Sequence, residues 1–304
     1  MSLLRPLART DGWSKSAGAI SAGDLSRPTG ARLHSGVDEL PPALRGGIVA
    51  IGQFDGVHRG HRELVSRARR RADELSVAAG VVTFSRHPAS LLRPLEEPPS
   101  LCTLQDKVEM LVDCGADFVI ALPVSAQLLQ TPPADFVTTT LLRDLQARSI
   151  VVGANFRFGH KAAGDAGLLR EIGRAHGTDV VIVDLLDVDE GPVSSTRIRG
   201  LIAAGHVHAA ARLLGREHCL DSVVTAHRQG VITACFHAGV MSPAPGVYEV
   251  AVEDLTSLNR TRRATTATIG PARAARILAS PSFARPPVDG QMRLSFLGRV
   301  PAGA

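Results

Sequence analysis

Two histidines, His58 and His61, stand where a predicted strand turns into a predicted helix. The apolar run 47–51 before them is rich in β-branched residues, as a buried strand is, and residues 64–75 after them place apolar side chains on one helical face. A helix N-terminus offers free backbone N–H groups and the positive end of its dipole, which favour an anion. Glycines leave the turn open for a phosphate to approach the backbone, at Gly52, Gly56 and Gly60. The spacing predicts a nucleotide site, against the alternative of two capping or core histidines.

A second anion-binding segment is predicted at Val193–Arg199, where three hydroxyl residues open a helix. Such residues can be a plain N-cap. Arg197 and Arg199 in the first turns oppose the helix dipole, so an anion between them and the N–H groups explains them better.

The loop Gly153–Gly164 carries further polar and aromatic side chains. Asn155 can both donate and accept hydrogen bonds. Phe156 and Phe158 suit a flat ring, although phenylalanines in a loop more often fill the core. By itself this loop is a weak signal.

The elements that position these residues are strands and helices in alternation. Strands are expected at 47–51, 80–84, 118–122, 149–153 and 180–183, and helices at 104–114, 134–146, 165–176, 195–204 and 207–214. Nearly continuous apolar strands joined by helices predict a doubly wound α/β domain with a parallel sheet. In such a sheet the ligand binds beyond the carboxyl ends of the strands, where all three segments emerge.

Composition narrows the class of protein. The chain has 304 residues, 44% of them hydrophobic, and no apolar run reaches the length of a membrane span, so we expect no membrane partner. A net charge of +5 with 4% aromatic residues fits acidic small substrates and is weak support for nucleic acid, which we do not expect as a partner. Four cysteines without metal or redox spacing predict free thiols and a cytoplasmic location. The sequence does not indicate the oligomeric state.

Three regions are expected along the chain. Residues 1–44 lack sustained periodicity and are expected to be a flexible extension, and residues 45–216 form the α/β domain. Residues 217–304 alternate apolar and polar side chains, with strands expected at 229–236, 245–250, 267–270 and 292–297, and form a small β domain.

Four motifs in order give the α/β domain a family resemblance. They read Gly-x-Phe-Asp-Gly-Val-His-x-Gly-His, Thr83-Phe-x-x-His-Pro88, Gly-x-Asn-Phe-x-Phe-Gly and Leu213-Leu-Gly-Arg216, with a Ser-Ser-Thr-x-x-Arg segment before the last. Together they resemble the adenylyltransferase module of prokaryotic FAD synthetases, members of the Rossmann-like nucleotidylyltransferase superfamily. The resemblance implies transfer of AMP from ATP to FMN, which gives FAD and pyrophosphate, with Mg²⁺ bound mainly through the ATP phosphates and no protein metal site.

The same resemblance implies roles for individual residues. Catalytic contacts to the reacting phosphates are expected from His58, His61, Asn155 and Arg199. ATP-binding contacts are expected from Gly52, Phe54, Asp55, Gly60, Ser195, Thr196 and Arg197. Flavin contacts are expected from Phe84, Phe136 and Phe158, with core packing as the alternative for each. Ser85-Arg86 and Pro192 depart from the family pattern at positions that bear on substrate affinity.

The β domain resembles riboflavin kinase less completely. Pro245–Val250 is similar to a kinase strand, but the Gly-Phe-Pro-Thr-Ala-Asn-type motif is missing, and residues 275–283 hold no acidic residue to act as the base. We therefore expect a degenerate, barrel-like kinase domain and no riboflavin kinase activity. The alternatives are an adenylyltransferase for a flavin analogue and a non-catalytic flavin- or nucleotide-binding regulatory protein.

Overall fold

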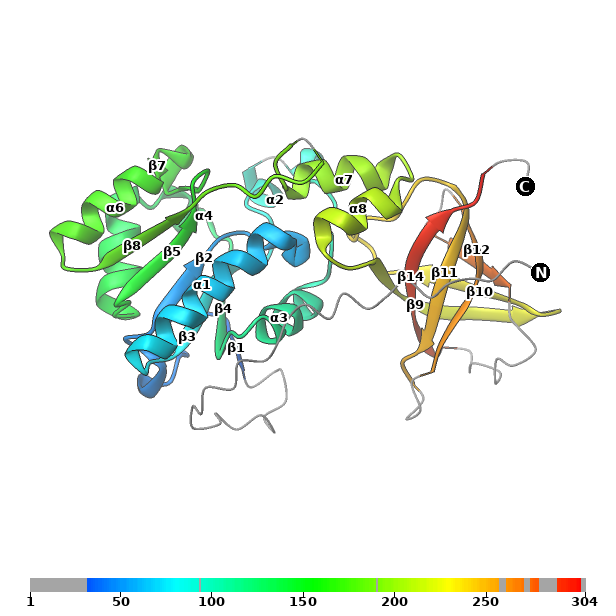
Figure 1. Cartoon of the computed structure of the whole chain (residues 1–304), viewed down its shortest axis with the longest axis horizontal. Helices are drawn as coiled ribbons and strands as arrows, with labels where there is room; N and C mark the ends of the chain where they lie inside the picture. The colour runs from blue at the N-terminus through cyan, green and yellow to red at the C-terminus, as the bar shows by residue number, and fades with distance from the viewer. Residues whose placement is uncertain are drawn as a thin grey trace.

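A parallel sheet covered by helices and a separate β-barrel make up the molecule, with two helices between them (Figure 1). The computed structural model describes residues 32–92, 94–189, 191–256, 261–270, 274–278 and 289–301. In that part of the chain, no helix is long and apolar enough to cross a membrane.

The sheet has six strands in the order β1-β4-β3-β2-β5-β8, and every neighbouring pair is parallel. The strands are β1 (Leu33–His34), β2 (Ile48–Ile51), β3 (Ala79–Phe84), β4 (Phe118–Leu122), β5 (Ser149–Gly153) and β8 (Asp179–Val183). From β2, chain order runs outward through β3 and β4 on one side and through β5 and β8 on the other, and β1 adds to the edge at β4. The carboxyl ends of β2 and β5 therefore form the switch point at which ligands bind in such sheets.

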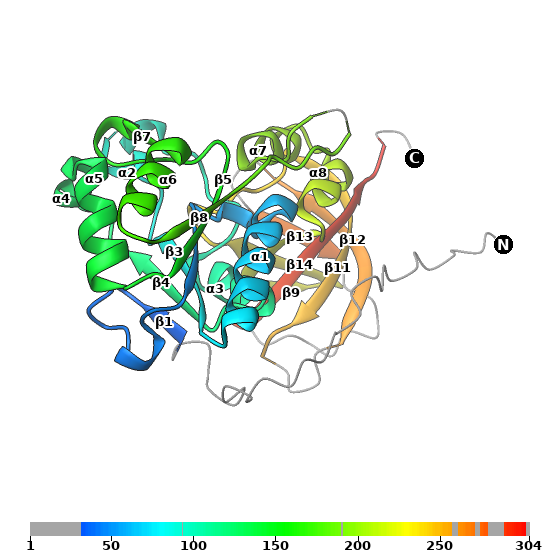
Figure 2. The same ribbon diagram turned by 60° about the vertical axis from the view of Figure 1, so that its left-hand side comes forward.

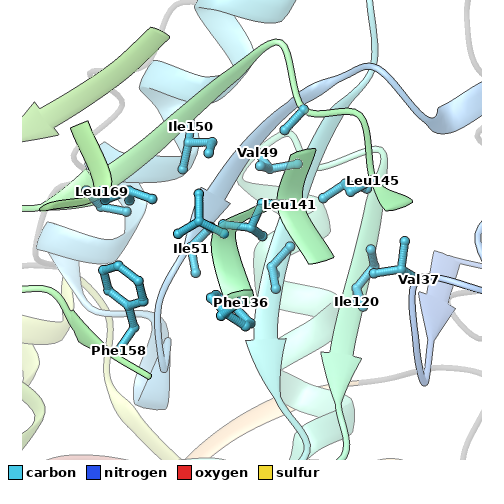
Figure 3. Close-up of a cluster of buried hydrophobic side chains, with 14 of the residues drawn as sticks. Val37, Val49, Ile51, Ile120, Phe136, Leu141, Leu145, Ile150, Phe158 and Leu169 are labelled. Atoms are coloured by element: carbon cyan, nitrogen blue, oxygen red, sulfur yellow. The ribbon is translucent and has the colours of Figure 1, made fainter. Parts of the chain in front are cut away.

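Helices cover both faces of this sheet, which confirms the predicted doubly wound α/β fold. On one face α1 (Arg59–Leu75) and α3 (Leu104–Asp113) pack against Ile48 and Ala50 of β2. On the other face η5 (Phe136–Asp144) and α6 (Ala166–Ala175) bury the alternate residues Val49 and Ile51 (Figure 3). Short elements complete the domain, namely η2 (Pro42–Leu44), η3 (Asp55–Val57), α2 (Ala89–Leu92), η4 (Pro94–Glu96), α4 (Ala126–Gln130), α5 (Pro133–Asp135), β6 (Arg157–Phe158), η6 (His160–Ala162) and β7 (Gly164–Asp165).

Three local predictions need correction. Residues 33–44 are not a free extension, because β1 pairs with β4 and Leu40 is buried in the core; residues 1–31 lie outside the described residues. The predicted helix 134–146 is π-helical over Phe136–Asp144, where two threonine hydroxyls bond to carbonyls four residues back and compete with the α-helical ladder. Leu75 is 40% exposed, because it is the last residue of α1 and lies past the buried face.

The C-terminal region is a closed antiparallel barrel in the order β10-β13-β12-β11-β14-β9, as a barrel-like domain was predicted. Its strands are β9 (His218–Arg228), β10 (Val231–Phe236), β11 (Gly246–Asp254), β12 (Arg262–Ile269), β13 (Ala274–Leu278) and β14 (Gln291–Arg299). The barrel core is apolar and centred on Tyr248 and Phe296, which are fully buried. Two helices, α7 (Ser195–Ala203) and α8 (Val207–Leu214), lie between the sheet and the barrel in Figure 1, and Figure 2 shows them at one end of the barrel strands.

Candidate functional site

His58 caps the N-terminus of α1 and is itself buried, with 6% of its surface exposed. Its Nδ1 accepts a hydrogen bond from the backbone N–H of His61 at 3.3 Å, so the ring proton is on Nε2. Burial and the nearby Arg216 guanidinium lower the pKa of His58 to about 4. At neutral pH the side chain is therefore a neutral hydrogen-bond donor.

His61 stacks on His58, with ring centroids 3.6 Å apart and planes 17° from parallel. Its other neighbour is the Phe54 ring, 5.0 Å away. Burial, followed by the charges on His58 and Lys107, lowers the pKa of His61 well below its ordinary value. Its Nδ1 is buried and has no hydrogen-bond partner among the described residues. The pair is neutral and has hydrogen-bonding capacity that the described residues do not use.

The backbone before the two histidines is held in a strained conformation. Phe54 and Val57 have backbone φ values of 51° and 38°, which residues other than glycine rarely adopt, and β-branched residues least of all. Gly56 between them has φ 74°, and a Cβ there would lie 2.8 Å from Leu101 Cδ1. Such conformations persist where the surroundings fix them, and they cluster at functional sites.

Asp55 connects this turn to α7. One carboxylate oxygen accepts the Leu101 backbone N–H at 2.8 Å, and the other pairs with Arg199 Nη1 at 2.6 Å. Ser195 Oγ donates to the Asp55 backbone carbonyl at 2.9 Å. Burial raises the pKa of Asp55, while the Leu101 N–H and the positive charge of Arg199 act in the opposite direction. Three predicted residues, Asp55, Ser195 and Arg199, are thus brought into direct contact.

The other polar residues of the α7 segment bond within the segment or to the loop that precedes it. Ser194 is the N-cap, because its Oγ accepts the backbone N–H of Arg197 at 3.2 Å. The Arg197 guanidinium donates to backbone carbonyls of the preceding loop, at Val188, Gly191 and Asp189. Thr196 Oγ1 lies 3.5 Å from Arg199 Nη2.

The predicted flavin residues lie at the edge of the sheet core. Phe136 and Phe158 are 4% and 6% exposed and pack among the sheet residues (Figure 3). Phe156, half-buried, stacks on Phe158 with centroids 5.3 Å apart. Phe84 is partly buried against the same core, and Asn155 is exposed. Core packing, the alternative noted for these phenylalanines, therefore describes Phe136 and Phe158 in this structure.

Two cations lie next to the histidines: buried Lys107, which the sequence interpretation missed, and partly buried Arg216, which it named only as part of the motif Leu213–Arg216. Lys107 on α3 is 5% exposed, and its Nζ donates to the carbonyls of Gln53 and Phe84 at 3.2 and 3.3 Å, which joins the ends of β2 and β3. The only indication of this role in the sequence is the position of Lys107, one turn after Leu104 on the apolar face of the predicted helix. The Arg216 Nη1 atom is buried and has no partner in the part of the chain that the structure describes.

The local charge balance favours an anionic ligand. Lys107 and Arg199 both act on the Asp55 carboxylate, and the Arg216 guanidinium lies near His58. Buried cations without an equal number of carboxylates are costly unless an anion joins them. No group of three or more His, Cys, Asp or Glu residues within the described ranges could hold a metal ion.

Comparison with known proteins finds related sequences and one structure of the same fold. A family model described as FAD synthetase matches residues 40–197. The bifunctional riboflavin kinase/FMN adenylyltransferase of Pseudomonas fluorescens is 34% identical over 228 residues, which covers 73% of each chain. The FAD synthetase of Listeria monocytogenes is 30% identical over 206 residues, covering 67% of this chain and 81% of that one. A Streptococcus pneumoniae structure described as a macrolide-efflux protein aligns with 90% of this chain at a TM-score of 0.78 and 24% identity, which shows the shared fold alone.

Proposed function

The chain belongs to the FAD synthetase family, and from this premise we propose how its residues perform adenylyl transfer and which second activity it lacks. A phosphate oxygen of FMN attacks the α-phosphorus of ATP, the bond to the β-phosphate breaks, and FAD and pyrophosphate form. Such transfer depends on positioning and on neutralising charge rather than on a protein nucleophile. The chain must therefore hold two phosphorylated substrates in line and stabilise the leaving pyrophosphate.

The stacked histidine pair at the start of α1 carries this proposal. Because both rings are neutral, they act as hydrogen-bond donors that assist the free N–H groups of the helix rather than as cations. The unpartnered Nδ1 of His61 supports a ligand contact at this place. Gly52 and Gly60 leave the turn free of side-chain bulk, since a Cβ at either position would meet the Phe54 or His58 ring at 3.3 Å.

The N-terminus of α7 supplies the second half of the phosphate site. We assign Ser195, Thr196 and Arg199 to the triphosphate tail, with Asp55 holding the Arg199 guanidinium in place. Asn155 is assigned to the reacting phosphates. Arg197 contributes indirectly, since its guanidinium fixes the 188–191 loop.

FMN is assigned to the aromatic side of the site. Phe84 and the half-buried Phe156 border the core, and Phe136 and Phe158 lie behind them. Flavin binding therefore uses the edge of an existing apolar cluster. Phe136 and Phe158 support the rings that contact the isoalloxazine.

Mg²⁺ fits this set of residues as an ion that arrives with ATP. The site offers one buried carboxylate, Asp55, whose two oxygens are already bonded to Leu101 and Arg199. When bound, Mg²⁺ neutralises phosphate charge, and its ligands are mainly phosphate oxygens and water.

The four cysteines are free, which supports a location in the reducing cytoplasm.

We infer that the barrel does not phosphorylate riboflavin. The kinase nucleotide motif is absent from the sequence, and residues 275–283 contain no acidic residue, although 279–283 lie outside the described residues. The barrel interior is packed with apolar side chains. An adenylyltransferase for a flavin analogue remains the second candidate, because Ser85-Arg86 and Pro192 depart from the family pattern.

One assay tests these assignments. The protein is incubated with ATP and Mg²⁺ and either FMN or riboflavin, and the flavins are separated by chromatography. FAD from FMN, with riboflavin unchanged, is the expected result. FMN formed from riboflavin would refute the loss of kinase activity, and a product only from another flavin would favour the analogue. No adenylylated product from any flavin would leave a binding protein as the better description.

A further inference from the structure

We propose that the barrel holds the adenylyl-transfer site in its active geometry by fixing the position of the segment 100–106. This inference rests on the proposed function, because the site in question is the one assigned to ATP. It gives the barrel a task that does not require kinase activity. Three sets of contacts support this proposal. Two lead from the barrel to the site through Ser100 and Leu101, and the third joins the barrel to Asp106.

The first contact is between the barrel loop after β10 and Ser100. Ser100 donates its backbone N–H to the Gly239 carbonyl at 2.8 Å and accepts the Met241 N–H at 2.7 Å. The two segments form a parallel bridge at Ser100 and Val240. His218 Nε2 lies 2.8 Å from the Met241 carbonyl, so the first residue of β9 fixes this loop from the barrel side. Ser100 is thereby held as if it belonged to the barrel.

The next residue, Leu101, transmits this position to the site. Its backbone N–H donates to the Asp55 carboxylate, whose other oxygen holds Arg199. Its side chain is 1% exposed, packs with the apolar residues of α7 and α8, and lies against Gly56. A displacement of Ser100 therefore moves Leu101, and with it both the hydrogen bond to Asp55 and the contact that fixes the strained turn before His58.

The third contact fixes the far end of the segment. Arg293 of β14 forms a bidentate pair with Asp221 of β9 and donates to Asp106 at 2.8 Å. Asp106 also completes the capping box of α3 with Thr103. Arg293, Asp106 and Asp221 are each 30% exposed or less, so this ion-pair network is partly shielded from water. The barrel thus holds the segment at both ends, with Leu101 between them.

Two glycines of the barrel offer a matched test. Gly239 and Gly230 have φ values of 83° and 76°, both are exposed, and neither would place a Cβ within 4 Å of another atom. Alanine strains the backbone to a similar degree at either position, and a local shift of the loop relieves that strain. Only Gly239 lies in the loop that bonds to Ser100, because Gly230 is in the β9–β10 turn.

We expect Gly239→Ala to speed amide hydrogen exchange in the peptide containing residues 100–106 by about tenfold and to lower kcat/KM for FAD formation by about fivefold. Gly230→Ala should change neither. Amide hydrogen exchange in β2 and β5 reports the stability of the parallel sheet and should stay constant in both variants. Equal behaviour of the two variants, or faster exchange without loss of kcat/KM, would overturn the proposal.

Arg293→Gln provides a second perturbation, with Arg276→Gln on the exposed face of β13 as its control. The first should loosen the segment 100–106 and lower kcat/KM about threefold or more, and the second should do neither. If Arg293→Gln leaves exchange in this segment unchanged, the Arg293–Asp106 ion pair does not fix the segment and this part of the proposal is wrong. A wild-type chain that made no FAD would refute the proposed function, whereas the exchange measurements would still report whether the barrel holds the segment.

Discussion

Acidification from pH 7 to pH 5 should destabilise the protein by about 2 kcal/mol through His58 alone. Burial and the nearby Arg216 charge lower the pKa of this imidazole from 6.5 to about 4. Between these two values the unfolded chain binds a proton at His58 and the folded chain does not. Stability therefore rises with pH in this window and is lost as the pH falls through it.

The magnitude follows from the two pKa values. The full difference corresponds to about 3 kcal/mol, reached at and below pH 4, and about 2 kcal/mol of it is lost between pH 7 and pH 5. Burial lowers the pKa of His61 and of His218 in the same direction, so they increase the acid sensitivity of the wild-type protein. The contribution of His58 is isolated by comparison with a variant that lacks it.

Urea unfolding at pH 7 and pH 5 measures this contribution in the wild type and in His58→Gln, which keeps a neutral polar side chain. The loss of unfolding free energy on acidification should be about 2 kcal/mol smaller in the variant. His208→Gln, which removes an exposed histidine from α8, is the matched control. Equal losses in the wild type and His58→Gln would refute the inference that His58 is held neutral by its surroundings.

Three further predictions concern the site and the core. His58→Ala and His61→Ala should each lower turnover about a hundredfold while FMN affinity, measured by fluorescence titration, changes little, and wild-type turnover in either variant would contradict the phosphate role. Gly56→Ala should cost about 2–3 kcal/mol in denaturant unfolding, because of its positive φ and the contact with a neighbouring leucine, against about 1 kcal/mol for Gly177→Ala, which has φ 73° and open space. Phe158→Ala should cost about 3 kcal/mol in the same experiment if the ring is part of the core, and a loss below about 1 kcal/mol would contradict that placement.

Much of the sheet domain could be predicted, because its strands are short apolar runs bounded by glycines or polar residues. Residues 118–122 and 149–153 matched β4 and β5 at both ends. The starts of α1 and α7, to which we assign the phosphates, were also predictable, since histidine or serine caps leave a local sequence signal. β1 was missed because a two-residue strand has no period, and its pairing with β4 depends on tertiary contacts.

The parts of the site that sequence reasoning missed are those that long-range packing creates. Lys107 and Leu101 have ordinary neighbours in the sequence, and their roles appear only when α3 and the segment before it fold against the turn at Asp55. The π-helical hydrogen bonding of 136–144 likewise cannot be distinguished from an α-helix by apolar spacing. The phenylalanines were ambiguous because an aromatic side chain has the same signature in a core as beside a flavin.

Transfer of AMP from ATP to FMN is the activity on which the assigned roles of the site residues depend. The most direct measurement follows ATP labelled at the α-phosphate in one reaction and at the γ-phosphate in another, each with Mg²⁺ and FMN. We expect the α label to appear in FAD and the γ label in pyrophosphate, in equal amounts. Label from the γ position in a flavin product, or no α label in any flavin, would contradict it.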